Sequence, residues 1–231
     1  MLKLKLDQLR TKLDQMNEKI ISRLVDRSRY KLNHRIYKKD AIFIRDRHGI
    51  SFLEFALEGL ENYHSLLGRY NFPDQYPIII NPKESSVKKI VTQWSIPRVK
   101  IDIGKDIIKF YTDSLKGFCL VGEDQTTYGE TAYCDADIIQ LLNERINLGR
   151  YVAETKLRSG FLEKKGAEKN LISKLRDPKR EKELIKKVQQ IAIRYGLNPK
   201  VAGKYFKWII GETLKIEVSY LKKSKPKTFK A

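Results

Sequence analysis

The sequence predicts an all-α protein, folded as a single-domain helical bundle over residues 1–231. Apolar residues recur at three- and four-residue steps in several long segments, which is the spacing of amphipathic helices. Helix start signals precede three of these segments, and we find neither an internal repeat nor a convincing strand alternation. Hydrophobic residues make up 41% of the chain and charged ones 32%, which excludes disordered and collagen-like proteins.

The first helix is expected from about Lys3 to about Tyr30, because no Gly or Pro interrupts the pattern there. Its apolar stripe consists of Leu6, Leu9, Leu13, Met16, Ile20 and Leu24. A helix of that length spans roughly 40 Å. It therefore needs partners along both halves, from its own chain or from a second subunit.

A second helix is expected to begin at Ser51, with Glu54 in the spacing of a capping box. Its predicted buried face consists of Phe52, Phe55, Ala56, Leu60, Tyr63 and Leu67. Prolines predict a loop over Asn71–Pro82, and a further helix is expected over Lys105–Leu115.

The polar segment Gly122–Tyr133 predicts a surface loop, although its Thr126, Thr127 and Tyr128 leave a short hairpin open. From Asp135 the helical pattern returns and continues to about Leu162.

Two further helices begin with a capping residue followed by proline, at Asp177-Pro178 and at Asn198-Pro199. The first of them is expected to stop at Tyr195-Gly196. The second continues to a basic tail over about residues 222–231, which we expect to be flexible.

The net charge of the chain and its cysteine content limit the classes of protein to which it can belong. Lys and Arg number 47 against 28 acidic residues, giving +19, and the pI is near 9.8. That charge suits nucleic-acid binding, but the cations are dispersed among acidic residues, which favours a solvated surface.

Two cysteines and three histidines predict neither a disulfide framework nor a set of metal ligands. No stretch approaches the ~20 apolar residues of a membrane span. The charged start predicts no secretory signal, so we expect a cytoplasmic protein.

Several polar residues lie on or beside apolar helix faces. Arg145 and Lys156 are eleven residues apart, so a helix places them on one side about 16 Å apart, with Gly149 and Val152 between them. Further members of this set are Arg10 beside the first stripe, Asp177 with Glu181, and Thr213 with Glu217. Taken singly, each has a structural explanation as a snorkelling cation, a helix-start acid or a solvated edge. Together they predict a pocket inside the bundle.

The residue order in these segments resembles that of the all-helical chorismate mutases of the AroQ class. The C-terminal half matches in Asn143-Glu-Arg145, in Val152-Ala-Glu-Thr-Lys156, in Asp177-Pro-Lys-Arg-Glu181 and in Ile209-Ile-Gly-Glu-Thr213-Leu-Lys-Ile-Glu217. The N-terminal half matches in Leu9-Arg10 and, for the long yeast- and plant-type branch, in Gly49-Ile-Ser-Phe-Leu-Glu-Phe-Ala-Leu57, Tyr63-His-Ser65 and Arg69-Tyr-Asn-Phe-Pro-Asp74. Only residues 82–122 and the tail fall outside the resemblance. It implies one domain with helices and loops inserted after the first long helix.

The resemblance implies the rearrangement of chorismate to prephenate, in phenylalanine and tyrosine biosynthesis, without metal or cofactor. It implies that Arg10 and Arg145 bind the two substrate carboxylates and that Lys156 donates to the ether oxygen and a carboxylate. By the same resemblance, Glu181 accepts from the ring hydroxyl, Asp177 supports the ligand or the lysine, and Thr213 donates to a carboxylate. Glu217 donates to the ether oxygen, which requires a protonated carboxyl.

Members of this branch bind effectors at a dimer interface, and the resemblance therefore implies a homodimer. The branch has two adjacent arginines after the His-Ser motif, where this chain has Gly68 and Arg69. The facing loop has Gly-Ser in the branch and Gly129-Glu130-Thr131 here. We therefore expect Arg69, Gly129, Glu130 and Thr131 to mark an altered effector site, without ordinary tyrosine feedback or tryptophan activation.

Two rival functions stay open at this point. A basic helical nucleic-acid-binding protein would use the lysine tail and the dispersed arginines for phosphate contacts. A non-catalytic regulatory bundle would keep the fold without turnover, although every position implied in the chemistry holds a competent residue.

Overall fold

Helices carry the regular structure of the computed structural model, which describes residues 6–88, 96–161 and 171–224. Within these ranges there are no strands, only two isolated bridges, so the all-α prediction is confirmed. The long helices are α1 (Leu6–Ser28), α2 (Phe52–Leu66), α3 (Gly104–Ser114), α4 (Tyr128–Asn147), α5 (Gly149–Arg158), α8 (Pro178–Arg194) and α9 (Pro199–Ser224). Shorter pieces are η1 (His34–Tyr37), η2 (Arg69–Asn71), η3 (Leu115–Gly117), η4 (Gln125–Thr127) and α7 (Leu171–Leu175).

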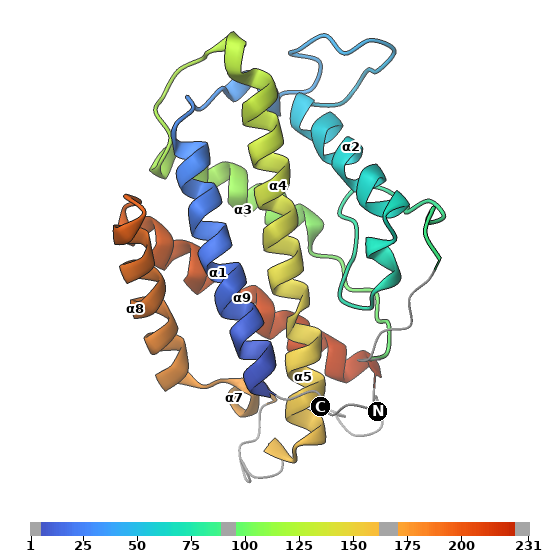
Figure 1. Ribbon diagram of the computed structural model, residues 1–231, viewed down its shortest axis with the longest axis vertical. Coiled ribbons are helices and arrows are strands. Elements are labelled where there is room, and N and C mark those ends of the chain that lie inside the picture. The colour runs from blue at the N-terminus through green and yellow to red at the C-terminus, as the bar shows by residue number, and fades with distance from the viewer. Residues whose placement is uncertain (1–5, 89–95, 162–170, 225–231) are drawn as a thin grey trace.

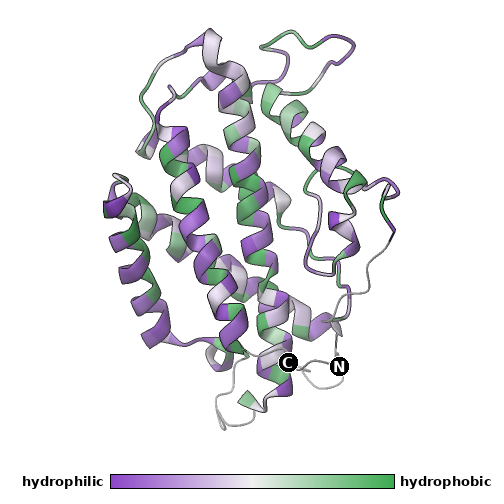
Figure 2. Cartoon of the chain, in the orientation of Figure 1, coloured by the Kyte–Doolittle hydropathy of each residue, from purple (hydrophilic) through white to green (hydrophobic). Residues whose placement is uncertain are grey.

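The bundle is built around α1 and α4, which lie side by side (Figure 1). In this view α8 flanks them on one side and α2 on the other, while α9 passes behind and packs against α4, α5 and α8. Figure 2 shows hydrophilic residues along the outer edge of α8 and hydrophobic ones along the edge that faces the bundle. No described helix is long and apolar enough to cross a membrane.

Most helix boundaries follow the predicted signals. Ser51 and Glu54 form both hydrogen bonds of the capping box. Asp177 caps α8 by accepting from the backbone N–H of Arg180, with Pro178 in the first turn. Asn198 accepts from the backbone N–H of Lys200 at the start of α9. The described part of the first helix, Leu6–Ser28, agrees with the prediction, whereas residues 3–5 and tail residues 225–231 lie outside the described residues.

The predicted buried face of α2 is right for half of its residues, because Phe52, Ala56 and Leu60 pack against the core. It is wrong for the other half. Phe55, Tyr63 and Leu67 are exposed, and α2 instead buries Leu53 and Leu57 together with polar residues. The polar residues are Glu61, His64 and Ser65. The carboxylate of Glu61 accepts hydrogen bonds from the backbone N–H groups of residues 78–80 and from the Gln140 amide, so a satisfied charge replaces apolar packing on the core side.

The predicted loop over Gly122–Tyr133 is also wrong in its second half. Asp124 caps η4 by accepting from the backbone N–H of Thr126, and α4 begins directly afterwards at Tyr128. Thr131 is buried there and accepts from the Asn33 amide. The polar residues thus hydrogen-bond within the fold, and neither the loop nor the hairpin extends over Tyr128–Tyr133. The following helical pattern breaks at Leu148, and α5 ends at Arg158 before the expected Leu162.

A buried ionic network joins α1 to α3 and α4 at one end of the bundle. Arg27 and Asp135 are both fully buried and pair at 2.6 Å. Arg27 also donates to the carbonyl of Leu32, while the hydroxyls of Tyr37 and Tyr111 donate to Asp135. Because these charged groups are paired and hydrogen-bonded, the network holds the upper ends of α1 and α4 in a fixed register.

Candidate active site

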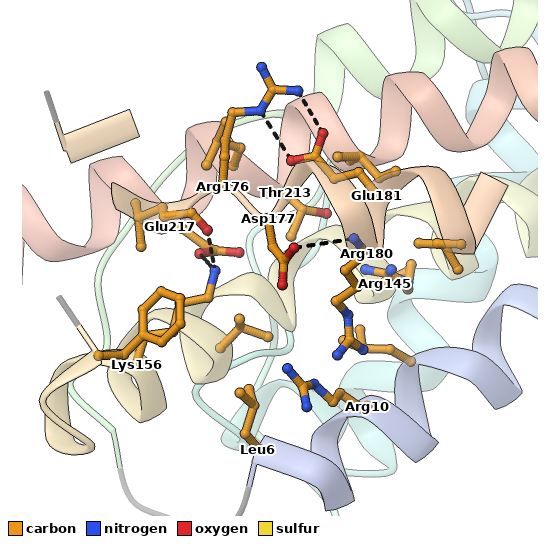
Figure 3. Close-up of a pocket in the computed structure, with 17 residues that line it drawn as sticks. Leu6, Arg10, Arg145, Lys156, Arg176, Asp177, Arg180, Glu181, Thr213 and Glu217 are labelled. Atoms are coloured by element: carbon orange, nitrogen blue, oxygen red, sulfur yellow. Dashed lines mark hydrogen bonds and ion pairs between the residues drawn. The ribbon is translucent and has the colours of Figure 1, made fainter. Parts of the chain in front are cut away.

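A cavity of about 820 Å³ of atom-free space, part of it open to solvent, lies between α1, α5, α8 and α9 (Figure 3). Its walls contain all seven residues to which the family resemblance assigns substrate contacts: Arg10, Arg145, Lys156, Asp177, Glu181, Thr213 and Glu217. Apolar side chains, among them Leu13, Val152 and Ile210, complete the lining. The structure brings these separate segments together around one pocket, while the role of each residue stays a prediction.

Lys156 and Glu217 face each other across the contact between α5 and α9. The Lys156 ammonium donates to Glu217 Oε2 at 2.8 Å and to the carbonyl of Leu175 at 2.8 Å. Both side chains are largely buried, with 13% and 7% of their surface exposed. Burial raises the pKa of the Glu217 carboxyl above its usual range, and nearby Glu181 raises it further, while Lys156 and Arg145 pull it down. The carboxyl therefore holds its proton more tightly than an ordinary glutamate.

Arg145 is a buried cation that forms no ion pair with any described residue, although Asp14 and Glu217 are close enough to favour its charge. Its Nε donates to Asn17 Oδ1 at 2.8 Å, but its Nη1 has no hydrogen-bond partner in the described structure. Burial lowers the pKa of Arg145 to about 10, so the group still carries its charge at neutral pH. An unpaired guanidinium inside a pocket is a binding group for a carboxylate, because its planar N–H groups match the two carboxylate oxygens.

Two arginines that sequence reasoning missed also line the cavity. Arg176 donates through Nε and Nη2 to the two carboxylate oxygens of Glu181, at 3.1 and 2.6 Å. Arg180 lies beside Arg10 and Arg145, and burial lowers the pKa of its guanidinium, with Arg10 adding to the effect. Their sequence signal is their position on either side of Asp177, the N-cap of α8, which places Arg176 directly before the cap and Arg180 in the first turn of the helix.

The cavity is electropositive. Five cations line it, namely Arg10, Arg145, Lys156, Arg176 and Arg180, against the three carboxyl groups of Asp177, Glu181 and Glu217. Five against three leaves two positive charges, or three when Glu217 is protonated. In Figure 3 the guanidinium groups of Arg10, Arg145 and Arg180 gather on one side, opposite the Lys156–Glu217 pair. Within the described residues no three His, Cys, Asp or Glu side chains gather as metal ligands.

The hydroxyl of Thr213 differs from its expected role. It donates to the carbonyl of Ile209 at 2.7 Å, so its proton is engaged within α9 and its oxygen is left as an acceptor. Thr213 also lies against Gly149, where α5 and α9 approach closely. A Cβ at Gly149 would lie 2.9 Å from Thr213 Cγ2 and 3.0 Å from its backbone oxygen.

We expect Gly149→Ala to destabilise the protein by about 1–3 kcal/mol, because the added methyl group overpacks the contact between α5 and α9. Separation of these helices also moves Lys156 away from Glu217, so kcat falls together with Tm. Thermal unfolding and turnover measure the two effects. Gly211→Ala is the matched control, since a Cβ at this α9 glycine meets nothing within 4 Å and should raise Tm slightly. Equal effects of the two substitutions would contradict the close approach at Gly149.

The four predicted effector residues do not meet within one chain. Arg69 follows α2, where it pairs with Glu144 and contacts His64 Nε2 at 2.7 Å. Gly129 and Glu130 are exposed at the start of α4, and Thr131 is buried beside them. Thr131 and Glu144 are thirteen positions apart in α4, which is about 20 Å along the helix. The effector site stays a prediction.

Known proteins share this architecture along nearly the whole chain. The family model described as chorismate mutase type II matches residues 127–218. A chorismate mutase of Schizosaccharomyces pombe is 27% identical, with 95% of this chain and 96% of that protein covered. The structure of the Candida albicans chorismate mutase Aro7p, in complex with L-Trp, matches with a TM-score of 0.81 at 27% identity, covering 95% of this chain and 91% of that one.

The chain belongs to the chorismate mutase family. Its likeness extends to the plant members, since the chloroplast chorismate mutase of Zea mays matches with a TM-score of 0.77 at 26% identity, covering 95% of both chains. A chorismate mutase is an isomerase, and this activity agrees with the resemblance seen in the sequence motifs. The matches with fungal and plant chorismate mutases also support the long branch of the family.

Proposed function

We propose that the cavity between α1, α5, α8 and α9 binds chorismate and that its rearrangement to prephenate takes place there. The observation that carries the proposal is the placement of the unpaired Arg145 guanidinium opposite the buried Lys156–Glu217 pair. Chorismate is a dianion whose breaking ether bond needs hydrogen-bond donors. The cavity supplies two excess positive charges and, on the other side, donors held in a buried pair.

The guanidinium side of the cavity has the task of holding the substrate. Arg10 and Arg145 bind the two carboxylates, and Arg180 adds a third cation beside them. Fixing both carboxylates folds the enolpyruvyl side chain over the ring, which brings the two reacting carbons together in a near-attack conformer. The apolar wall of Leu13, Val152 and Ile210 excludes water from this conformer.

The opposite side stabilises the charge that develops as the C–O bond breaks. Lys156 donates to the ether oxygen, and the protonated carboxyl of Glu217 donates to the same atom. Donors that are already in place before the reaction stabilise such a charge strongly in a buried site. The ion pair of Arg176 with Glu181 holds that carboxylate at the cavity wall, where it accepts from the ring hydroxyl. Asp177 uses Oδ1 to cap α8, and its second carboxylate oxygen serves the ligand. Thr213 donates to a substrate carboxylate after its hydroxyl turns away from the carbonyl of Ile209.

We expect kcat/KM to fall as pH rises through the pKa of Glu217, because the ionised carboxyl accepts a hydrogen bond where the reaction needs a donor. The raised pKa of this buried group moves the fall to a higher pH than an ordinary glutamate would show. Glu217→Gln keeps a donor at every pH, so its pH profile should be flat over this range. The pH dependence of kcat/KM for both proteins measures the effect. A sloping profile that Glu217→Gln leaves unchanged would remove Glu217 from this role.

One assay separates this function from its rivals. Loss of chorismate absorbance on addition of purified protein, abolished by Arg145→Ala, supports an enzyme that works in this cavity. Absence of turnover together with salt-sensitive DNA or RNA binding favours the basic nucleic-acid-binding protein. Absence of both favours the non-catalytic bundle.

We further propose a homodimer in the cytoplasm. Its support is the apolar surface of α2, where Phe55, Tyr63, Leu66 and Leu67 are all exposed, and a second copy of the chain would cover them. Sedimentation of the purified protein tests this state.

The response to amino acid effectors is a separate proposal. The structure of Aro7p is a complex with L-Trp, and the solved structure of AtCM1, another similar protein, has tyrosine bound in an allosteric site. For this chain we propose no ordinary response to either amino acid, because Arg69 pairs with Glu144, and rates measured with each one added test that proposal.

A further inference from the structure

Asn17 is a polar residue in the apolar stripe of α1. It lies one helical turn after Leu13 and three residues before Ile20, and only 1% of its surface is exposed. A buried amide in such a stripe is unfavourable unless its polar atoms are hydrogen-bonded. The contacts of Asn17 therefore need an explanation.

The amide of Asn17 is satisfied on one side only. Its Oδ1 accepts from Arg145 Nε at 2.8 Å, while its Nδ2 has no partner in the described structure. The amide orientation follows from this contact, because Arg145 Nε–H is a donor and needs the oxygen rather than the nitrogen. Arg145 Nη1 also lacks a partner. Two buried N–H donors on joined side chains are thus left over, although unmade hydrogen bonds of buried donors disfavour the fold.

The two side chains lie where the main cavity continues into a second hollow. Asn17 and Arg145 both line this hollow, between α1 and α8, and it shares Leu13, Arg145, Arg180 and Leu184 with the main cavity. The remaining lining residues are Asp14, Glu183 and Lys187. Of the acidic groups, Asp14 pairs with Lys187 at 2.8 Å. Arg145 thus borders both spaces and Asn17 borders the second, so a small rotation of the two side chains brings their buried donors to a ligand held in the main cavity.

We propose that Asn17 positions Arg145 and binds a substrate carboxylate beside it. Its Oδ1 fixes the rotation of the guanidinium about Nε, and its Nδ2 donates to one oxygen of the carboxylate that Arg145 binds. An amide suits both tasks because it offers an acceptor and a donor and leaves the charge of Arg145 uncancelled. An aspartate in its place would hold Nε equally well but would neutralise the cation. This inference rests on the proposed function and adds a residue to its carboxylate site.

The test compares Asn17→Leu and Asn17→Asp in chorismate kinetics and thermal unfolding. Asn17→Leu should raise KM by about 10- to 100-fold, the weight of one hydrogen bond to a charged group, with a smaller change in kcat. Asn17→Asp should raise Tm, because buried Arg145 gains a counterion, while its KM stays raised. Asn147→Leu is the matched control, since Asn147 is equally buried and accepts from Arg150, but its bonds stay within the fold. It should lower Tm and leave KM unchanged.

The outcomes are distinguishable. A KM of Asn17→Leu within twofold of the wild type, in a protein whose turnover depends on Arg145, overturns this inference and leaves the proposed function intact. Full recovery of KM in Asn17→Asp overturns the donor role of Nδ2. Absence of turnover by the wild-type protein overturns both the inference and the proposed function.

Discussion

Replacing Lys156 by methionine is expected to lower kcat for chorismate rearrangement by about 10²–10³-fold, the loss seen when one donor to a developing negative charge is removed. Methionine keeps the length of the side chain without its charge. The fold should persist, because Glu217 can take up a proton once its ion pair with Lys156 is lost. Initial rates at saturating chorismate measure the effect, and Tm reports on the fold.

The matched control is Lys215→Met, on the same helix as Glu217. Lys215 also pairs with a buried glutamate of α9, Glu212, at 2.7 Å, but most of its side chain is exposed and it does not line the cavity. Its replacement should leave kcat within about twofold, as expected for an exposed ion pair of little energetic weight. A kcat of Lys156→Met within the same range would place the reaction outside this cavity.

Replacing Arg145 by methionine should lower kcat/KM by about 10²–10⁴-fold and at the same time raise Tm. The kinetic loss follows from two charge-assisted hydrogen bonds to a substrate carboxylate, each contributing about 1.5–3 kcal/mol. The stability gain follows from the lowered pKa of Arg145, which means that folding disfavours its charged form. That penalty is present at every pH below the folded pKa of about 10, so the gain should be constant across neutral pH. The Asn17 oxygen loses its donor, which offsets only part of the gain.

Arg27→Met provides the contrasting control. Arg27 is as buried as Arg145, but it pairs with Asp135 and donates to backbone carbonyls. Removing one partner of such a buried pair costs about 3–5 kcal/mol, so Tm should fall steeply. A fall in Tm for Arg145→Met of the same size would mean that Arg145 anchors the fold rather than a ligand.

The helix boundaries were predictable wherever a local hydrogen bond sets them. Ser51 with Glu54, and Asp177 before Pro178, satisfy the first backbone N–H groups of their helices within a few residues of sequence, so their pattern suffices. The rotation of α2 was not predictable in this way. It depends on Glu61, which binds backbone groups 17–19 residues later, a long-range contact that apolar periodicity cannot reveal.

The site residues were predictable mainly through the family resemblance of separated motifs. Residue spacing alone places Arg145 and Lys156 on one side, and both reach the cavity although the helix breaks between them at Leu148. The roles of Arg176 and Arg180 depend on how α8 is oriented against α1, which a single sequence does not encode locally. Asn17 did have a signal, because an amide in a leucine stripe is an exception to the pattern that surrounds it.

The paired network of Arg27 and Asp135 has a consequence for engineering this molecule. Arg27 lies about 26 Å along α1 from Arg10, at the 1.5 Å rise of an α-helix. One end of this helix therefore stabilises the fold, while the other end lines the cavity. Thermal stability can be raised by improving the packing near Tyr37 and Tyr111, beside the Arg27–Asp135 network. Such changes leave the distant cavity and its excess positive charge undisturbed. Selection for thermal resistance alone would instead favour replacement of Arg145, which yields a more stable protein without turnover.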